Sequence, residues 1–129
     1  MKTRGFSLIE LMIVTVIVAL LAGLALPQFD AVRERAYDNA TLADLNSTVD
    51  EIERYFSEHF VYPSSEDDLF AEGFAPSPDV SFLRFDLNNN SNPSLATLHI
   101  HITHAGSPHY FHYIYDPTEI TDAPELRWK

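Results

Sequence analysis

GFSLIELMIVTVIVALLAGLALPQF, residues 5–29, is the stretch of sequence that decides the fold. Between Phe6 and Leu26 it has 21 residues without Lys, Arg, Asn, Gln or Asp. A helix of that length spans about 31 Å, which is enough to cross a bilayer core of about 30 Å. Lys2 and Arg4 precede the apolar run and favour a cytoplasmic N-terminus. The sequence therefore predicts one membrane-spanning helix, with the remaining residues outside the cytoplasm.

A secretory signal peptide is the alternative interpretation of this stretch, because Gly23-Leu24-Ala25 supplies the small residues of a cleavage site. Two features argue against it. The apolar run is longer than a signal-peptide core of about 7–15 residues, and it contains Glu10. A carboxylate inside a membrane span costs roughly 2.5–3.5 kcal/mol, so it is a functional hypothesis by default.

The order of residues in this stretch resembles the type IV pilin signature. Gly5-Phe6-Ser7-Leu8-Ile9-Glu10 is followed by the apolar run Leu11-Met12-Ile13-Val14, and the resemblance ends at Leu26-Pro27-Gln28-Phe29. It implies cleavage by a prepilin peptidase between Gly5 and Phe6 on the cytoplasmic face, followed by N-methylation of the Phe6 amine. This processing leaves the apolar helix on the mature protein.

The resemblance also assigns filament assembly to Phe6, Glu10 and Pro27. We expect Glu10 in the first helical turn, where a carboxylate favours the positive end of the helix dipole. In filaments of this family that carboxylate pairs with the N-terminus of a neighbouring subunit, and breaking a buried pair costs roughly 3–5 kcal/mol. The alternative is a capping carboxylate without a partner. Pro27 is expected to kink the helix or to loosen the turn before it.

Helical periodicity continues from Gln28 to about Phe60, without Gly or Pro after Phe29. The predicted apolar stripe comprises Phe29, Val32, Ala36, Ala40, Ala43, Leu45, Val49, Ile52, Phe56 and Phe60. Its small residues Ala36, Ala40 and Ala43 are assigned to core packing in preference to subunit contacts. A helix from Phe6 to Phe60 would be about 80 Å long, too long for so small a domain to cover. Its apolar front half must therefore lie in lipid or pack against copies of itself.

The rest of the sequence predicts a small α+β domain. Tyr62-Pro63 ends the long helix, and Ser65 caps a short helix that runs to about Ala71. Alternating patterns predict strands over residues 80–87, 95–102 and 109–115, and the tail to Lys129 has no strong pattern. A three-stranded antiparallel sheet on the second half of a long N-terminal helix is the pilin fold that the resemblance implies.

These elements predict three parts of the chain: a leader peptide over residues 1–5, a membrane-spanning and filament-core helix over 6–27, and a globular domain over 28–129. The globular domain is expected to hold an amphipathic helix over 28–61 and a sheet over about 80–115.

Composition excludes several classes of protein. The 129 residues include no Cys, so there is neither a disulfide nor a thiolate metal site. Eight Lys and Arg against nineteen Asp and Glu give a net charge of −11, which argues against nucleic-acid binding. Many type IV pilins close a C-terminal loop with a disulfide, so here that segment must be held by packing, with Trp128 a candidate.

Histidines supply the candidate metal ligands. His99 and His101 share a strand face, and another strand could bring His109 or His112 near them. A polar, solvent-facing sheet surface explains the same spacing and is preferred. Asp86 opens a D-x-N-x-N pattern typical of a calcium loop, but the expected Gly and Glu are missing. An Asn-rich hairpin connection is therefore favoured, and no metal or cofactor is predicted.

Together these features predict a structural subunit of a type IV pilus and no enzyme, since no nucleophile–base constellation stands out. The expected partners are copies of itself, the prepilin peptidase, the pilus assembly machinery and the inner membrane, with no direct contact to nucleic acid. The precursor would cross the inner membrane once before joining an extracellular fibre. A type II secretion pseudopilin is one alternative, and a membrane-anchored metal-binding or electron-transfer module is another.

Overall fold

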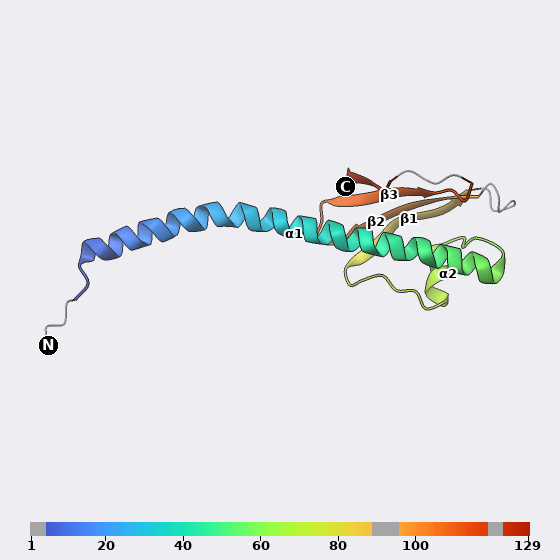
Figure 1. Ribbon diagram of the computed structural model, residues 1–129, viewed down its shortest axis with the longest axis horizontal. Helices are drawn as coiled ribbons and strands as arrows, with labels where there is room; N and C mark the ends of the chain where they lie inside the picture. Colours follow the sequence, from blue (N-terminus) through green and yellow to red (C-terminus); the bar gives the residue numbers. More distant parts are fainter. Residues whose placement is uncertain (1–4, 89–95, 119–122) are drawn as a thin grey trace. The chain divides into compact units, whose positions relative to one another are not determined.

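The computed structural model describes residues 5–88, 96–118 and 123–129, with the side chains of residues 25–27 left out. Its elements are α1 (Leu8–His59), α2 (Glu66–Ala71), β1 (Val80–Asn88), β2 (Thr97–His104), β3 (His109–Tyr115) and β4 (Glu125–Trp128). The chain divides into two compact units, residues 1–33 and residues 34–129, and α1 contributes to both (Figure 1).

The first unit consists of the N-terminal part of α1 and the residues before it. Ser7 precedes the helix, and its carbonyl accepts the first helical hydrogen bond, from the N–H of Leu11. Within the described residues, α1 is the one helix long and apolar enough to cross a membrane. The helix runs through position 27 without a break. The kink expected at Pro27 stays a prediction.

The second unit is an antiparallel sheet in the order β1-β2-β3-β4, with the C-terminal half of α1 packed on it. Phe82 faces Ile102 across the first pair of strands, and Ile102 faces Phe111 across the second. The buried core joins Leu45 and Ile52 of α1 to these strands. The α+β class and the long helix on a small antiparallel sheet are therefore confirmed.

The prediction of three strands is wrong, because residues 125–128 form β4 along the free edge of β3. All four residues of β4 are exposed, so the strand carries no burial pattern that a sequence would reveal. Backbone pairing holds it, together with ring contact between Trp128 and His109 at 4.2 Å. The Lys129 side chain also donates to the carbonyls of Ser107 and His104, at 2.6 and 3.0 Å. Trp128 therefore helps to anchor this end, as expected.

The predicted apolar stripe of α1 is only partly correct. Ala36 and Ala43 are exposed and Phe60 is 75% exposed, so the two alanines do not serve the core as expected. Thr41 and Thr48 are buried instead. Their hydroxyls donate to backbone carbonyls one turn back, at 2.9 and 2.8 Å, which satisfies the polar groups inside the core.

Helix ends lie close to where the sequence places them. The helix α1 ends at His59, and Phe60 takes a left-handed conformation with φ 60° before the buried pair Tyr62-Pro63. Ser65 is the N-cap of α2, as predicted. Gly73 follows the helix with φ 94°, a conformation in which glycine is favoured because it lacks a Cβ.

Candidate functional site

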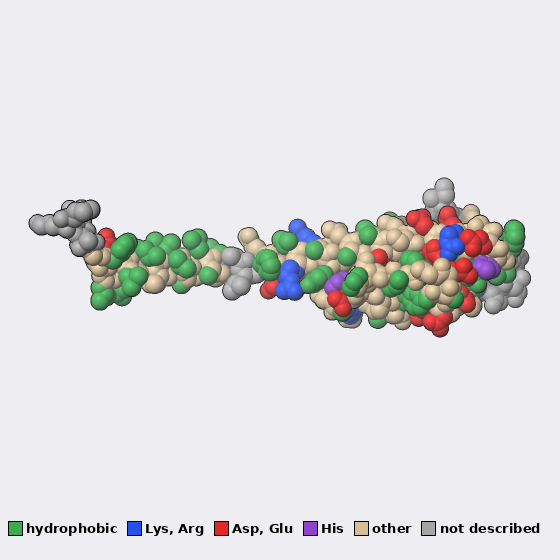
Figure 2. Space-filling view, turned by 90° about the horizontal axis from the view of Figure 1, so that it is seen from below, with side chains coloured by type: hydrophobic (Ala, Val, Ile, Leu, Met, Phe, Trp, Pro, Cys, Tyr) green, Lys and Arg blue, Asp and Glu red, His purple; other side chains and the backbone are tan. Residues whose placement is uncertain are grey.

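The N-terminal part of α1 has the longest run of exposed apolar side chains among the described residues. Every large apolar side chain from Phe6 to Leu24 is at least half exposed. Figure 2 shows this segment as a nearly continuous hydrophobic surface. Soluble monomers rarely expose apolar patches of more than a few hundred Å², and larger ones mark membrane or protein interaction sites.

One face of this segment carries a shallow groove of about 320 Å³. Its walls are Ile9, Met12, Ile13, Val16 and Ile17, which follow the three- and four-residue spacing of a single helix face. Grooves between such rows accept the side-chain ridges of another helix. The surface is therefore shaped for helix packing as well as for contact with lipid.

Polar side chains in the apolar segment form hydrogen bonds with the backbone of the same segment. The Glu10 carboxylate accepts the backbone N–H of Ser7 at 2.8 Å, and the Ser7 hydroxyl accepts the N–H of Ile9 at 3.2 Å. The Thr15 hydroxyl donates to the carbonyl of Met12 at 2.9 Å. The structure thus places Glu10 in the first turn of α1, as expected, where it caps the helix start.

Gly5 and Phe6, the predicted cleavage pair, lie ahead of α1 in residues without regular structure. A Cβ atom added to Gly5 would meet no atom of the described residues within 4 Å, so their packing does not require a glycine there. Phe6 is 84% exposed and has no core role. Both residues are accessible to another protein.

Two carboxylates of α1, outside its predicted apolar stripe, tie the helix to the sheet and its loops. Asp44 is 9% exposed and accepts the Ser77 backbone N–H and hydroxyl, both at 3.0 Å. Asp38 accepts the Ser107 hydroxyl at 2.6 Å and contacts Nδ1 of His109 at 3.0 Å. No local pattern in the sequence predicts these contacts, because the partners lie 33 or more residues away.

The strand histidines are only partly gathered as predicted. His101 faces His112 across β2 and β3, with ring centroids 4.8 Å apart, and the His99 and His112 rings are 6.3 Å apart. Burial, followed by the charges of neighbouring histidines and arginines, lowers the pKa of His101. His109 is directed to Asp38 instead.

Asp86 does not open a loop. It lies within β1, where its carboxylate pairs with Arg84, so the proposed calcium-loop pattern starts inside a strand. The Asn-rich connection over residues 89–95 lies outside the described residues. Among the described residues, no group of three metal-ligating side chains with converging atoms includes His99, His101 or Asp86.

A different group does converge. The ligating atoms of Glu58, His59 and Glu72 all lie within 4.8 Å of one another. Glu58 and His59 belong to the last turn of α1, and Glu72 is the C-cap residue of α2. Sequence reasoning missed this group because Glu72 stands 13 residues from His59 and does not belong to any motif with it.

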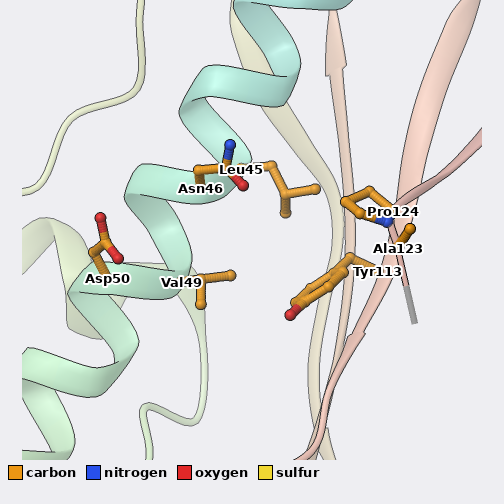
Figure 3. A pocket seen from close by; sticks show the side chains of 7 residues that line it. All are labelled: Leu45, Asn46, Val49, Asp50, Tyr113, Ala123 and Pro124. Carbon is orange, nitrogen blue, oxygen red and sulfur yellow. The ribbon is translucent and has the colours of Figure 1, made fainter. Parts of the chain in front are cut away.

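A cavity of about 370 Å³ opens between α1 and β3 (Figure 3). Leu45, Val49 and Tyr113 line it from the two elements, and Pro124 closes one side. Asp50 lies at its margin. Among the described residues, the lining has no histidine and no carboxylate besides Asp50, so these residues offer packing surface without an acid–base pair.

Comparison with known proteins gives matches along most of the chain. A family model described as the prokaryotic N-terminal methylation motif matches residues 1–26. The chain is 37% identical over 91 residues to the type IV wide pilus major component PilA4 of Thermus thermophilus, and the match covers 70% of both chains.

For two other relatives, the match covers a smaller share of each chain. The type II secretion system core protein G of Klebsiella pneumoniae is 33% identical over 78 residues, which cover 60% of this chain and 56% of the relative. The type IV major pilin protein PilA of Myxococcus xanthus is 35% identical over 75 residues, 58% of this chain but 33% of the relative. The chain therefore spans about half or less of these two proteins.

Proposed function

The chain belongs to the type IV pilin and type II secretion pseudopilin superfamily, and from this membership we propose that it is the structural subunit of a type IV pilus. The uncovered apolar surface of α1 between Phe6 and Leu24 carries this proposal. In water that surface is unstable, so it must be covered by lipid in a precursor and by neighbouring copies of the same helix in a fibre.

Packing between copies of α1 gives a homopolymer. The groove lined by Ile9, Ile13 and Val16 accepts a ridge from a neighbouring helix, and apolar burial contributes roughly 25 cal/mol for each Å² removed from water. The acidic globular units then lie outside this core, where their charge keeps the fibre soluble. The chain itself performs no reaction in this role.

Processing precedes assembly in this proposal. A prepilin peptidase cuts between Gly5 and Phe6 on the cytoplasmic face, and the freed Phe6 amine is methylated. Gly5 suits the cut because a glycine leaves the peptide unhindered for the protease, and packing among the described residues does not account for it. The match of residues 1–26 to the methylation motif supports the same assignment.

Glu10 sets the register of the fibre. Among the described residues, only one of the two Glu10 carboxylate oxygens has a hydrogen-bond partner, so the other can accept the N-terminal amine of a neighbouring subunit. Inside an apolar core an unpaired carboxylate is costly, so the axial stagger that joins the two charges is strongly preferred.

The proposed location follows from the charges that flank the span. Lys2 and Arg4 hold the N-terminus in the cytoplasm, and the precursor crosses the inner membrane once. Assembly machinery in that membrane then transfers the processed subunit to a fibre outside the cell.

Deletion and complementation in the source organism test the main proposal. We expect loss of long surface fibres in electron micrographs of the deletion strain, and their return with an epitope-tagged copy that antibodies locate along the fibre. Normal fibres without the tag in the complemented strain would contradict the proposal.

A pseudopilin of type II secretion is the second candidate, because a core protein G of that system is among the relatives. The same strains separate the two functions. A pseudopilin predicts normal surface fibres and a loss of secreted enzymes from the culture medium, whereas a pilus subunit predicts the reverse.

A further inference from the structure

We propose that Glu58, His59 and Glu72 form a binding site for a divalent transition-metal ion such as Zn²⁺. The site joins the last turn of α1 to the C-cap of α2, within the second unit of the chain. It lies outside the apolar segment, so the proposal does not rest on the proposed fibre assembly.

The distance between two of the three ligands suits a small dication. Nε2 of His59 lies 3.2 Å from Oε1 of Glu72, and the Glu58 carboxylate completes a set of atoms that all lie within 4.8 Å. In a tetrahedral zinc site, Zn–N and Zn–O bonds of about 2.0–2.2 Å place two ligand atoms about 3.4 Å apart. The His59 and Glu72 atoms are thus already spaced as two ligands of one ion.

The donor set selects the kind of ion. An imidazole with two carboxylates is a typical ligand set for zinc and neighbouring first-row metals, whereas Ca²⁺ and Mg²⁺ take oxygen ligands. Three protein ligands leave a fourth position for water. A net charge of −11 on the chain also favours attraction of cations.

Neighbouring side chains hold the ligands in place. The ring of Tyr55 packs against His59 with centroids 4.3 Å apart, which restricts rotation of the imidazole. The backbone N–H of Glu72 bonds the carbonyl of Leu69 at 3.2 Å and fixes the end of α2. Ordering of ligands by such contacts before the metal arrives improves affinity.

Arg54 competes for Glu58, with which it pairs at 2.8 Å. The same guanidinium also pairs with Glu51 and lowers the pKa of that carboxyl. Arg54 therefore keeps a carboxylate partner when Glu58 turns toward a metal. The exchange costs little, because ion pairs between exposed side chains contribute little to stability.

Calorimetric titration of the full chain in detergent with ZnSO₄ tests the site. We expect one Zn²⁺ per chain, and at least about tenfold weaker binding in His59→Ala and in Glu72→Gln, since even the loss of groups that only support metal ligands costs 10–100-fold. His101→Ala is the matched control, because it removes a histidine from the sheet and leaves the proposed ligands intact. Both ligand residues are about a third or more exposed, so the variants should fold, which circular dichroism without metal verifies.

Three results would overturn the proposal. The first is unchanged Zn²⁺ affinity in both ligand variants. The second is loss of binding in His101→Ala, which would place the site on the sheet. The third is Ca²⁺ binding that is as tight as Zn²⁺ binding and is undiminished in His59→Ala. That result would mean that surface carboxylates alone attract the cation and that His59 is not a ligand. Fibre yield of the same variants is measured separately, so failure of the metal site is distinct from failure of the assembly proposal.

Discussion

The Glu10 carboxylate accepts the backbone N–H of Ser7 at 2.8 Å, and so closes the first turn of α1 from within. This hydrogen bond gives Glu10 a role inside one chain, beside the proposed role between chains. A capping carboxylate contributes about 0.5–2 kcal/mol to a helix end, whereas an unpaired charge in an apolar core costs roughly 3–5 kcal/mol. The role between chains should therefore depend on the Glu10 charge more strongly than the capping role does.

Glu10→Gln separates these roles, because glutamine keeps an acceptor oxygen for Ser7 and removes the charge. We expect Glu10→Gln and Glu10→Ala to insert in the membrane and to be cleaved, yet to enter fibres poorly in a strain that has no wild-type copy. Fibres sheared from cells and quantified by immunoblot give the measurement. Normal fibre yield with glutamine would show that capping suffices and would remove the charge-pairing argument.

Gly5→Lys should leave only the unprocessed precursor. A long side chain next to the scissile bond hinders the peptidase, although no atom of the described residues lies within 4 Å of an added Cβ. Intact-mass analysis of membrane extracts detects the retained residues 1–5. Gly23→Ala is the matched control, since a Cβ there also meets no atom within 4 Å, and it should mature normally. Normal maturation of Gly5→Lys would refute the assigned cleavage site.

The apolar segment could be predicted from sequence because its signal is local. Twenty-one residues without Lys, Arg, Asn, Gln or Asp specify a membrane-length helix whatever the rest of the chain does. The position of Glu10 in the first turn follows from the same stretch. Strand β2 was also predictable, since its alternation of side chains reflects one buried face.

Features that depend on distant partners could not be predicted. The strand β4 has no buried residue, so only pairing with β3 reveals it. The sequence alone indicates a solvent-facing acid at Asp44, because only the fold brings Ser77 into contact with it. The approach of Glu72 to His59 depends on the turn after α1, where Phe60 takes φ 60°, and helical periodicity does not determine that turn.

Asp44→Ala should destabilise the second unit. The buried carboxylate satisfies the Ser77 N–H and hydroxyl, and hydrogen bonds to a charged group contribute about 1.5–3 kcal/mol. We expect a loss of that size in the free energy of unfolding, measured by denaturant titration of the full chain in detergent. Asp50→Ala, at an exposed position of the same helix, should change stability by less than about 0.5 kcal/mol. Equal effects of the two changes would contradict the anchoring role of Asp44.

Asp68 should make the stability of the α2 region depend on pH in the acid range. Its carboxylate accepts the Ser64 backbone N–H at 2.7 Å and the Ser64 hydroxyl at 2.8 Å, and the Ser65 N–H at 3.3 Å. The Ser64 hydroxyl is the main cause that lowers the pKa of Asp68 from 3.8, burial opposes it, and the backbone donors add to the lowering. A carboxyl whose pKa is lowered by folding stabilises the fold above its unfolded pKa, and this contribution is lost as the pH falls through the folded value.

Asp68→Asn should therefore be less stable than the wild type at neutral pH, by about 1 kcal/mol for a weakened hydrogen-bond network. Unfolding midpoints of the wild type and of Asp68→Asn are measured from pH 7 down to about pH 2. The difference in stability between them should shrink only below pH 3.8, the ordinary pKa of an aspartate, because the wild-type carboxylate then takes up a proton. Asp67→Asn, at an exposed position in the same turn, is the control and should follow the wild type. A difference that stays constant to the lowest pH would mean that Asp68 acts through its shape, and that its charge does not stabilise the turn.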